Sequence, residues 1–96
     1  MKPVAVVATV VARPGCEAAV EARLRALVAP SRTDKGCIRY VLHKSQDDPR
    51  VFVFMEAWES RALLQSHLET EHIAAWRADA PELIESMDVK VLDDIA

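Results

Sequence analysis

An α+β fold with the element order βαββαβ is predicted by three observations on this 96-residue chain. Two stretches, 4–12 and 51–58, are apolar at nearly every position, which is typical of strands buried on both faces of a sheet. Two longer stretches, 16–33 and 61–87, repeat apolar residues at steps of three and four, as amphipathic helices do. The turn-rich segment 46–50 separates two strand-like runs and predicts a β-hairpin.

The first strand is expected over Val4–Ala12, which is rich in valine and bounded by proline and glycine. The helix that follows should run from Cys16 to about Thr33 and end at Pro30 or soon after, because proline lacks the N–H group that a helix interior uses. Its apolar positions recur at helical spacing: Val20, Leu24, Leu27 and Val28. The segment Thr33–Gly36 is the expected turn at its end.

The second half of the chain predicts a hairpin, a broken helix and a last strand. The hairpin strands are expected over 37–45 and 51–58. Ser60 is a suitable cap for a helix that begins at Arg61 and extends to about Met87. We expect Glu69-Thr70-Glu71 and Pro81 to divide this helix into two or three pieces. The last strand is expected between Asp88 and Ile95.

This order is the split βαβ arrangement of ferredoxin-like folds, with a four-stranded antiparallel sheet. Strands 4–12 and 51–58 should be central because both of their faces are apolar, and the other two strands carry the charges typical of edges. The two helical stretches can cover only one face of the sheet. A second copy of the chain is the simplest cover for the other face, so we expect a homodimer.

Composition limits the classes of function. The length indicates a single domain over 1–96. A net charge of −3 without a basic stripe argues against a nucleic-acid partner. The longest apolar run is about half of the roughly 20 residues that a spanning helix needs, so we expect no membrane partner and a cytoplasmic location. Cys16 and Cys37 do not have the spacing of a metal-binding or redox motif. We expect two buried thiols, and a disulfide between them is the open alternative.

The polar residues of the hairpin are candidates for a binding site. If the hairpin closes around Asp48-Pro49, Tyr40 lies opposite Ala57, and Glu56 shares a face with Arg39 and His43. An unpaired buried carboxylate is costly, so Glu56 should form an ion pair with Arg39 or act as an acid–base or orienting group. His43 is either an ordinary edge residue or a site residue. Trp58 and Trp76 are either core residues or stacking surfaces for an aromatic ligand.

His67 and His72 form an HxxxxH pattern. On a continuous helix their side chains would lie roughly 140° apart, which is not the spacing of a helical zinc pair, so no metal site is expected. If Glu69 to Glu71 interrupts the helix, both imidazoles can turn toward one cavity. The alternative is that His67 ends the first helical piece and His72 begins the next.

Several short motifs together resemble the antibiotic biosynthesis monooxygenase domain family, especially its small quinol monooxygenase members. In chain order they are Pro14-Gly15, GCIRY at 36–40 with His43 after it, DDP at 47–49, Glu56-Ala57-Trp58 and HLETEH at 67–72. The likeness extends from Val4 to Val91. It implies a dimeric α+β barrel with a mostly apolar pocket in each subunit.

The resemblance also implies an activity. Family members oxidise phenols, anthrones or quinols with dioxygen, several of them without flavin, haem or metal, because a deprotonated electron-rich ring can itself reduce dioxygen. A small aromatic substrate, dioxygen and no cofactor are therefore expected. His67 or His72 suits the role of base. The substrate-binding candidates are Tyr40, His43, Glu56, Trp58 and Trp76.

Other branches of this family fit the sequence less well. Haem-degrading members use an asparagine on the first strand, and this chain contains no asparagine. Isomerases of a phosphorylated sugar would need a cluster of arginine and lysine that the pocket sequence lacks. A different class of function is a dimeric domain that binds a small aromatic ligand without catalysis. Oxygen consumption with a hydroquinone separates that function from an oxygenase.

Overall fold

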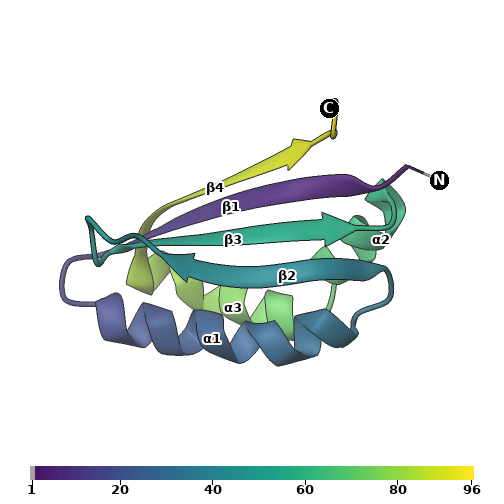
Figure 1. Cartoon of the computed structure of the whole chain (residues 1–96). Helices are drawn as coiled ribbons and strands as arrows, with labels where there is room; N and C mark the ends of the chain where they lie inside the picture. Colours follow the sequence, from purple (N-terminus) through teal and green to yellow (C-terminus); the bar gives the residue numbers. More distant parts are fainter. Residues whose placement is uncertain (1) are drawn as a thin grey trace.

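The computed structural model describes residues 2–96, with the element order βαββαβ in which the second helical region is split (Figure 1). The elements are β1 (Val4–Ala12), α1 (Glu17–Thr33), β2 (Cys37–Lys44), β3 (Val51–Trp58), α2 (Arg61–Leu68), α3 (Glu71–Leu83) and β4 (Ile84–Leu92). The predicted ferredoxin-like α+β fold is confirmed. Met1 lies outside the described residues.

The four strands form one antiparallel sheet in the order β2-β3-β1-β4. The central strands are therefore β1 and β3, as their apolar character on both faces predicted. Their alternate side chains turn toward the helices and are almost fully buried. On that face the two strands contribute Val6, Ala8, Val10, Ala12, Phe52, Phe54 and Trp58 to the core.

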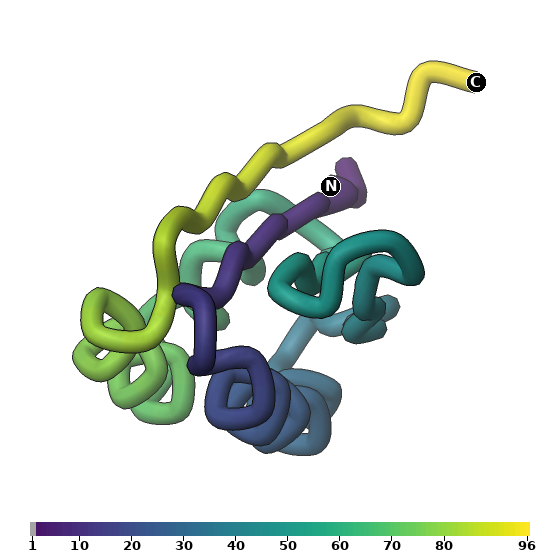
Figure 2. The backbone as a smooth tube through the Cα atoms, turned by 90° about the vertical axis from the view of Figure 1, so that its left-hand side faces the viewer, coloured from purple at the N-terminus to yellow at the C-terminus, as the bar shows by residue number. Residues whose placement is uncertain are grey.

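Helices α1 and α3 cover this face of the sheet, and Figure 2 shows both on the same side of the strands. They contribute Val20, Leu24, Leu27, Ile73, Trp76 and Ala80 to the core. The opposite face carries apolar side chains such as Val7, Val53 and Met55, and no element of residues 2–96 covers it. The expected second copy on this face stays a prediction. In the described chain, no helix combines the length and apolar character that crossing a bilayer requires.

One predicted helix end is confirmed and one differs from the structure. Helix α1 continues past Pro30 and ends at Thr33, as expected, and the Thr33 hydroxyl donates to the Pro30 carbonyl at 2.8 Å. Helix α3 stops at Leu83 rather than near Met87. Strand β4 then begins at Ile84, four residues before the expected start, because it pairs with β1 from Ala12 onward.

The predicted register of the hairpin was wrong by one residue. Tyr40 pairs with Glu56, not with Ala57, and the segment between Ser45 and Val51 forms a loop with an odd number of residues. The Ser45 hydroxyl accepts from two backbone N–H groups inside this loop at 3.1 and 3.2 Å, which stabilises the longer turn. A one-residue shift exchanges the faces of a strand, so Tyr40 joins Glu56 on the helix side.

The turn between α1 and β2 depends on Gly36. Its φ of +86° lies in the region that favours glycine, and its backbone lies directly against Leu63 of α2. This close approach brings the end of α1 next to α2. The two cysteines, Cys16 and Cys37, are half-buried free thiols in the structure.

Candidate active site

A cavity of about 270 Å³ lies between the helix-facing side of the sheet and helices α2 and α3. We call it the apolar cavity, because its wall is mainly hydrophobic. Apolar residues of the wall include Val6, Ala8, Leu64, Ile73, Trp76 and Val89. The polar side chains among its lining residues are Tyr40, Glu56, His67 and the two exposed arginines Arg61 and Arg77. A mostly apolar wall with a few polar groups is typical of small-molecule sites.

The two histidines of HxxxxH are brought together by the break between α2 and α3. Helix α2 ends at Leu68, and the carbonyl of His67 accepts from the Thr70 backbone N–H at 3.2 Å and from the Thr70 hydroxyl at 2.8 Å, which closes the end of the helix. His72 lies in the first turn of α3. The imidazole centroids are 6.0 Å apart. The predicted interruption at 69–71 is therefore confirmed, whereas Pro81 lies inside α3 near its end and does not divide the helix as expected.

Asp34 joins the two imidazoles. Its Oδ2 atom is 2.8 Å from Nδ1 of His67 and 3.0 Å from Nε2 of His72. We call these residues the Asp34–His67–His72 cluster. Sequence reasoning treated Asp34 only as part of a turn, and no local signal could have found its role, because its partners lie 33 and 38 residues away.

The hydrogen-bond network assigns the tautomers of both rings. A carboxylate only accepts, so Nδ1 of His67 and Nε2 of His72 each carry the proton that they donate to Asp34. The Thr70 hydroxyl donates its own proton to the His67 carbonyl. Its oxygen lies 3.2 Å from Nε2 of His72, so it is a second acceptor for the proton on that nitrogen. His67 lines the apolar cavity and Asp34 does not, so Nε2 of His67 is the nitrogen available to the cavity as an acceptor.

His67 is held between aromatic rings. Its side chain is 2% exposed, and its ring lies 4.4 Å from the Trp58 ring and 5.4 Å from the Tyr40 ring, centroid to centroid. Burial lowers the pKa of His67, while the hydrogen bond to the Asp34 carboxylate opposes this shift. The ring is thus kept neutral near neutral pH, with a fixed orientation.

Glu56 and Tyr40 are two further buried polar groups of the cavity. The indole N–H of Trp58 donates to Oε1 of Glu56 at 2.9 Å. Burial raises the pKa of Glu56, and the Trp58 hydrogen bond opposes the shift. Burial and, secondarily, the nearby Glu56 charge raise the pKa of Tyr40, so its phenol stays protonated and can donate. The expected Glu56–Arg39 ion pair is not present among residues 2–96, because the register shift puts Arg39 on the opposite face.

The raised pKa of Glu56 predicts a pH-dependent penalty on folding. Above the ordinary pKa of 4.5, the unfolded chain releases the Glu56 proton before the folded chain does, so the free energy of unfolding falls until the folded pKa is passed. A tenfold difference in proton affinity between the two states corresponds to about 1.4 kcal/mol. The titratable and charged side chains that line the same cavity are Tyr40, Arg61, His67 and Arg77.

The matched variant is Glu56→Gln, which keeps an acceptor for Trp58 but does not titrate in this range. Urea unfolding of both proteins at about pH 5 and about pH 8 should show the wild type losing stability relative to the variant as pH rises. A stability difference that does not change with pH would contradict this prediction.

The structure brings together most of the residues that the sequence singled out. Tyr40, Glu56, His67 and Trp76 line the apolar cavity. Trp58 packs on His67 and holds Glu56. His72 does not line the cavity but contacts His67 through Asp34. His43 lies on the other side of β2, with Nδ1 3.3 Å from the Val53 carbonyl.

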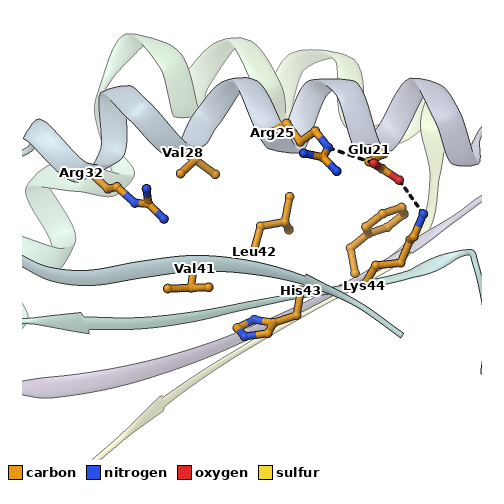
Figure 3. A pocket seen from close by; sticks show the side chains of 9 residues that line it. Glu21, Arg25, Val28, Arg32, Val41, Leu42, His43 and Lys44 are labelled. Carbon is orange, nitrogen blue, oxygen red and sulfur yellow. Dashed lines mark hydrogen bonds and ion pairs between the residues drawn. The ribbon is translucent and has the colours of Figure 1, made fainter. Parts of the chain in front are cut away.

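A second depression, of about 350 Å³, lies between α1 and β2. Figure 3 shows Leu42 and Lys44 pointing toward α1, whereas Val41 and His43 point away from it. Glu21 accepts from Arg25 at 2.9 Å and from Lys44 at 2.8 Å, so these charges largely neutralise one another at the surface. This groove has no buried acid–base pair, and the apolar cavity is the better candidate for chemistry.

Comparison with known proteins agrees with this arrangement. Residues 3–79 match the family model described as antibiotic biosynthesis monooxygenase. The chain belongs to the antibiotic biosynthesis monooxygenase family. It is 37% identical over 82 residues to a Mycobacterium tuberculosis protein named "Putative monooxygenase Rv0793". The aligned region covers 85% of this chain and 80% of that protein.

Solved structures of similar proteins support the same assignment. The crystal structure of PA3566 from Pseudomonas aeruginosa matches with a TM-score of 0.95 and 36% identity. The match covers 100% of this chain and 97% of the PA3566 chain. The structure of Rv0793 has a TM-score of 0.93 and 34% identity, covering 99% and 97%. The resemblance to the antibiotic biosynthesis monooxygenase family is therefore confirmed, while the names of these relatives specify no substrate.

Proposed function

We propose that this member of the antibiotic biosynthesis monooxygenase family oxygenates a small aromatic quinol or polyphenol with dioxygen, with His67 as the general base. One observation carries the proposal: a buried histidine, oriented by Asp34, lines an otherwise mainly apolar cavity. A base must lie within hydrogen-bond reach of the proton that it removes. A substrate hydroxyl directed at Nε2 of His67 meets this requirement.

The other polar groups of the cavity suit the binding of a second hydroxyl. Tyr40 can donate a hydrogen bond, and Glu56 can accept or donate according to its protonation state. Trp76 provides an apolar surface for the ring. The cavity of about 270 Å³ has room for a small aromatic compound and dioxygen rather than for a large polycyclic substrate.

The reaction balances without an external reductant. Proton transfer from a hydroquinone hydroxyl to His67 produces an electron-rich phenolate, which reduces dioxygen by one electron. Recombination forms a carbon–oxygen bond, and cleavage of the oxygen–oxygen bond releases water. In total, hydroquinone and dioxygen give a hydroxyquinone and water. The substrate supplies all four electrons, and the proposal therefore includes no flavin, haem or metal cofactor.

The test is oxygen consumption by metal-free protein over a panel of hydroquinones, compared with autoxidation of each compound alone. With labelled dioxygen, the product should contain one labelled oxygen atom and the second label should appear in water. Release of hydrogen peroxide instead would indicate simple oxidation rather than oxygenation.

No oxygen uptake above autoxidation across the panel would contradict the proposal. Saturable binding of the same compounds, measured by quenching of Trp76 and Trp58 fluorescence, would then favour a ligand-binding domain without catalysis.

A further inference from the structure

The Asp34–His67–His72 cluster contains more ligand atoms than a base and its orienting group require. Nδ1 of His67, Nε2 of His72 and Oδ2 of Asp34 all lie within 4.8 Å of one another. Two imidazoles and one carboxylate are a ligand set that divalent first-row transition metals bind. The HxxxxH spacing alone excluded this set, but the break between α2 and α3 brings the two rings together.

We propose that Asp34, His67 and His72 form a binding site for a divalent transition-metal ion with the preferences of Zn²⁺. The three side chains come from two separate places in the chain, the end of α1 and the α2–α3 junction. Stacking of His67 on Trp58 at 4.4 Å holds one ligand ring in place before the ion binds. A bound ion would thus connect two segments that a carboxylate now connects by hydrogen bonds.

The geometry needs only a small adjustment. With bonds of about 2.0 Å, tetrahedral ligand atoms lie about 3.3 Å apart. The present separations of 2.8 and 3.0 Å from Asp34 are slightly shorter, and the two histidine nitrogens lie within 4.8 Å of each other. Small movements of the carboxylate and of the His72 side chain would bring all three atoms to bonding distance from one ion. The side chains of Asp34 and His72 are 17% and 23% exposed, which gives the ion a path from solvent and leaves a coordination position for water.

Metal binding would change the tautomer of His67. The ion takes the lone pair of Nδ1, so the ring proton moves to Nε2, the nitrogen available to the apolar cavity. His67 then presents a donor instead of an acceptor and cannot remove a proton from a substrate. This consequence, inhibition by the metal, rests on the proposed function, whereas the metal site itself does not.

The test of the site is a titration of metal-free protein with Co²⁺, which gives visible absorption when bound by nitrogen and oxygen ligands. We expect one Co²⁺ per chain, displaced by Zn²⁺. Asp34→Asn and His72→Gln should each weaken binding by more than the roughly 10- to 100-fold that loss of an outer-sphere partner costs. His43→Gln is the matched control, because His43 is the one histidine outside the cluster.

Circular dichroism is the check that the variants fold, which we expect because both substituted positions are partly exposed and the replacements are polar. The absence of Co²⁺ absorption in the wild type up to about 1 mM ion, or equal binding by the wild type and both cluster variants, would overturn the site.

Oxygen uptake separates the two proposals. Co²⁺ binding without any oxygen uptake by the metal-free protein supports the metal site and contradicts the proposed oxygenase. Oxygen uptake that persists when the site is saturated with Zn²⁺ contradicts the tautomer change at His67 but leaves the oxygenase standing.

Discussion

Replacing His67 by glutamine should lower kcat for a hydroquinone by about 10²- to 10⁴-fold, the usual contribution of a general base. Glutamine retains a polar side chain of similar reach, but its amide cannot accept a proton near neutral pH. The apolar cavity keeps its other lining residues, so KM should change much less than kcat. Initial rates of oxygen uptake over a range of hydroquinone concentrations measure both constants.

Asp34 is a positioning residue in this scheme, and its replacement should have a smaller effect. In Asp34→Asn the amide oxygen can still accept from Nδ1 of His67, but the negative charge that stabilises the protonated ring is lost. We expect kcat to fall less than in His67→Gln and the acid limb of its pH profile to move to lower pH. A purely structural role for Asp34 would lower the fraction of folded protein without moving the profile.

His43→Gln is the control for the His67 and Asp34 variants. His43 lies on the far side of β2 from the apolar cavity, so its replacement should leave oxygen uptake unchanged. If His67→Gln, folded by circular dichroism, turns over the substrate as fast as His43→Gln, then His67 is not the base.

Replacing Gly36 by alanine should cost about 2–4 kcal/mol of unfolding free energy, the largest stability effect that we predict for a single methyl group. Part of this cost comes from the positive φ of +86°, a backbone conformation that is unfavourable for a residue with a Cβ atom. The larger part is steric, because the added Cβ would lie 2.6 Å from Cδ1 and 2.7 Å from Cβ of Leu63. The Cβ of Leu63 cannot move without moving α2.

Gly15 provides the matched control. Its φ is +89°, but no atom of residues 2–96 lies within 4 Å of an added Cβ atom. Gly15→Ala should therefore cost only the backbone share, about 1 kcal/mol. Urea unfolding of both variants measures the difference. Equal destabilisation would show that contact with Leu63 is not the reason for glycine at position 36.

The Gly36 variant should also affect the site. Leu63 lies one helical turn before His67 in α2, and Gly36 follows Asp34 by two residues. Moving α2 away from the turn lengthens the distance between Asp34 and His67. Gly36→Ala should consequently reduce oxygen uptake under conditions in which it is fully folded, whereas Gly15→Ala should not.

Much of the fold could be predicted from local sequence patterns. The continuous apolar character of 4–12 and 51–58 predicted two central strands, and the polar segment at 69–71 predicted the helix break. The family resemblance was equally visible in short motifs. These features depend on side chains that are near one another in sequence, where hydrophobic spacing and turn chemistry act directly.

Sequence alone determined the order of elements, the central strands and the pair of candidate bases, His67 and His72, and the structure then placed only His67 at the cavity. Only the tertiary structure decided the hairpin register that places Tyr40 beside Glu56, the separation of His43 from the cavity, and the contact of Asp34 with two histidines. One residue more or less in the hairpin loop decides which side chains of a strand point toward the helices. The two histidines that contact Asp34 lie more than 30 residues away from it in the sequence. Such contacts follow from the packing of whole elements, which no local pattern of residues records.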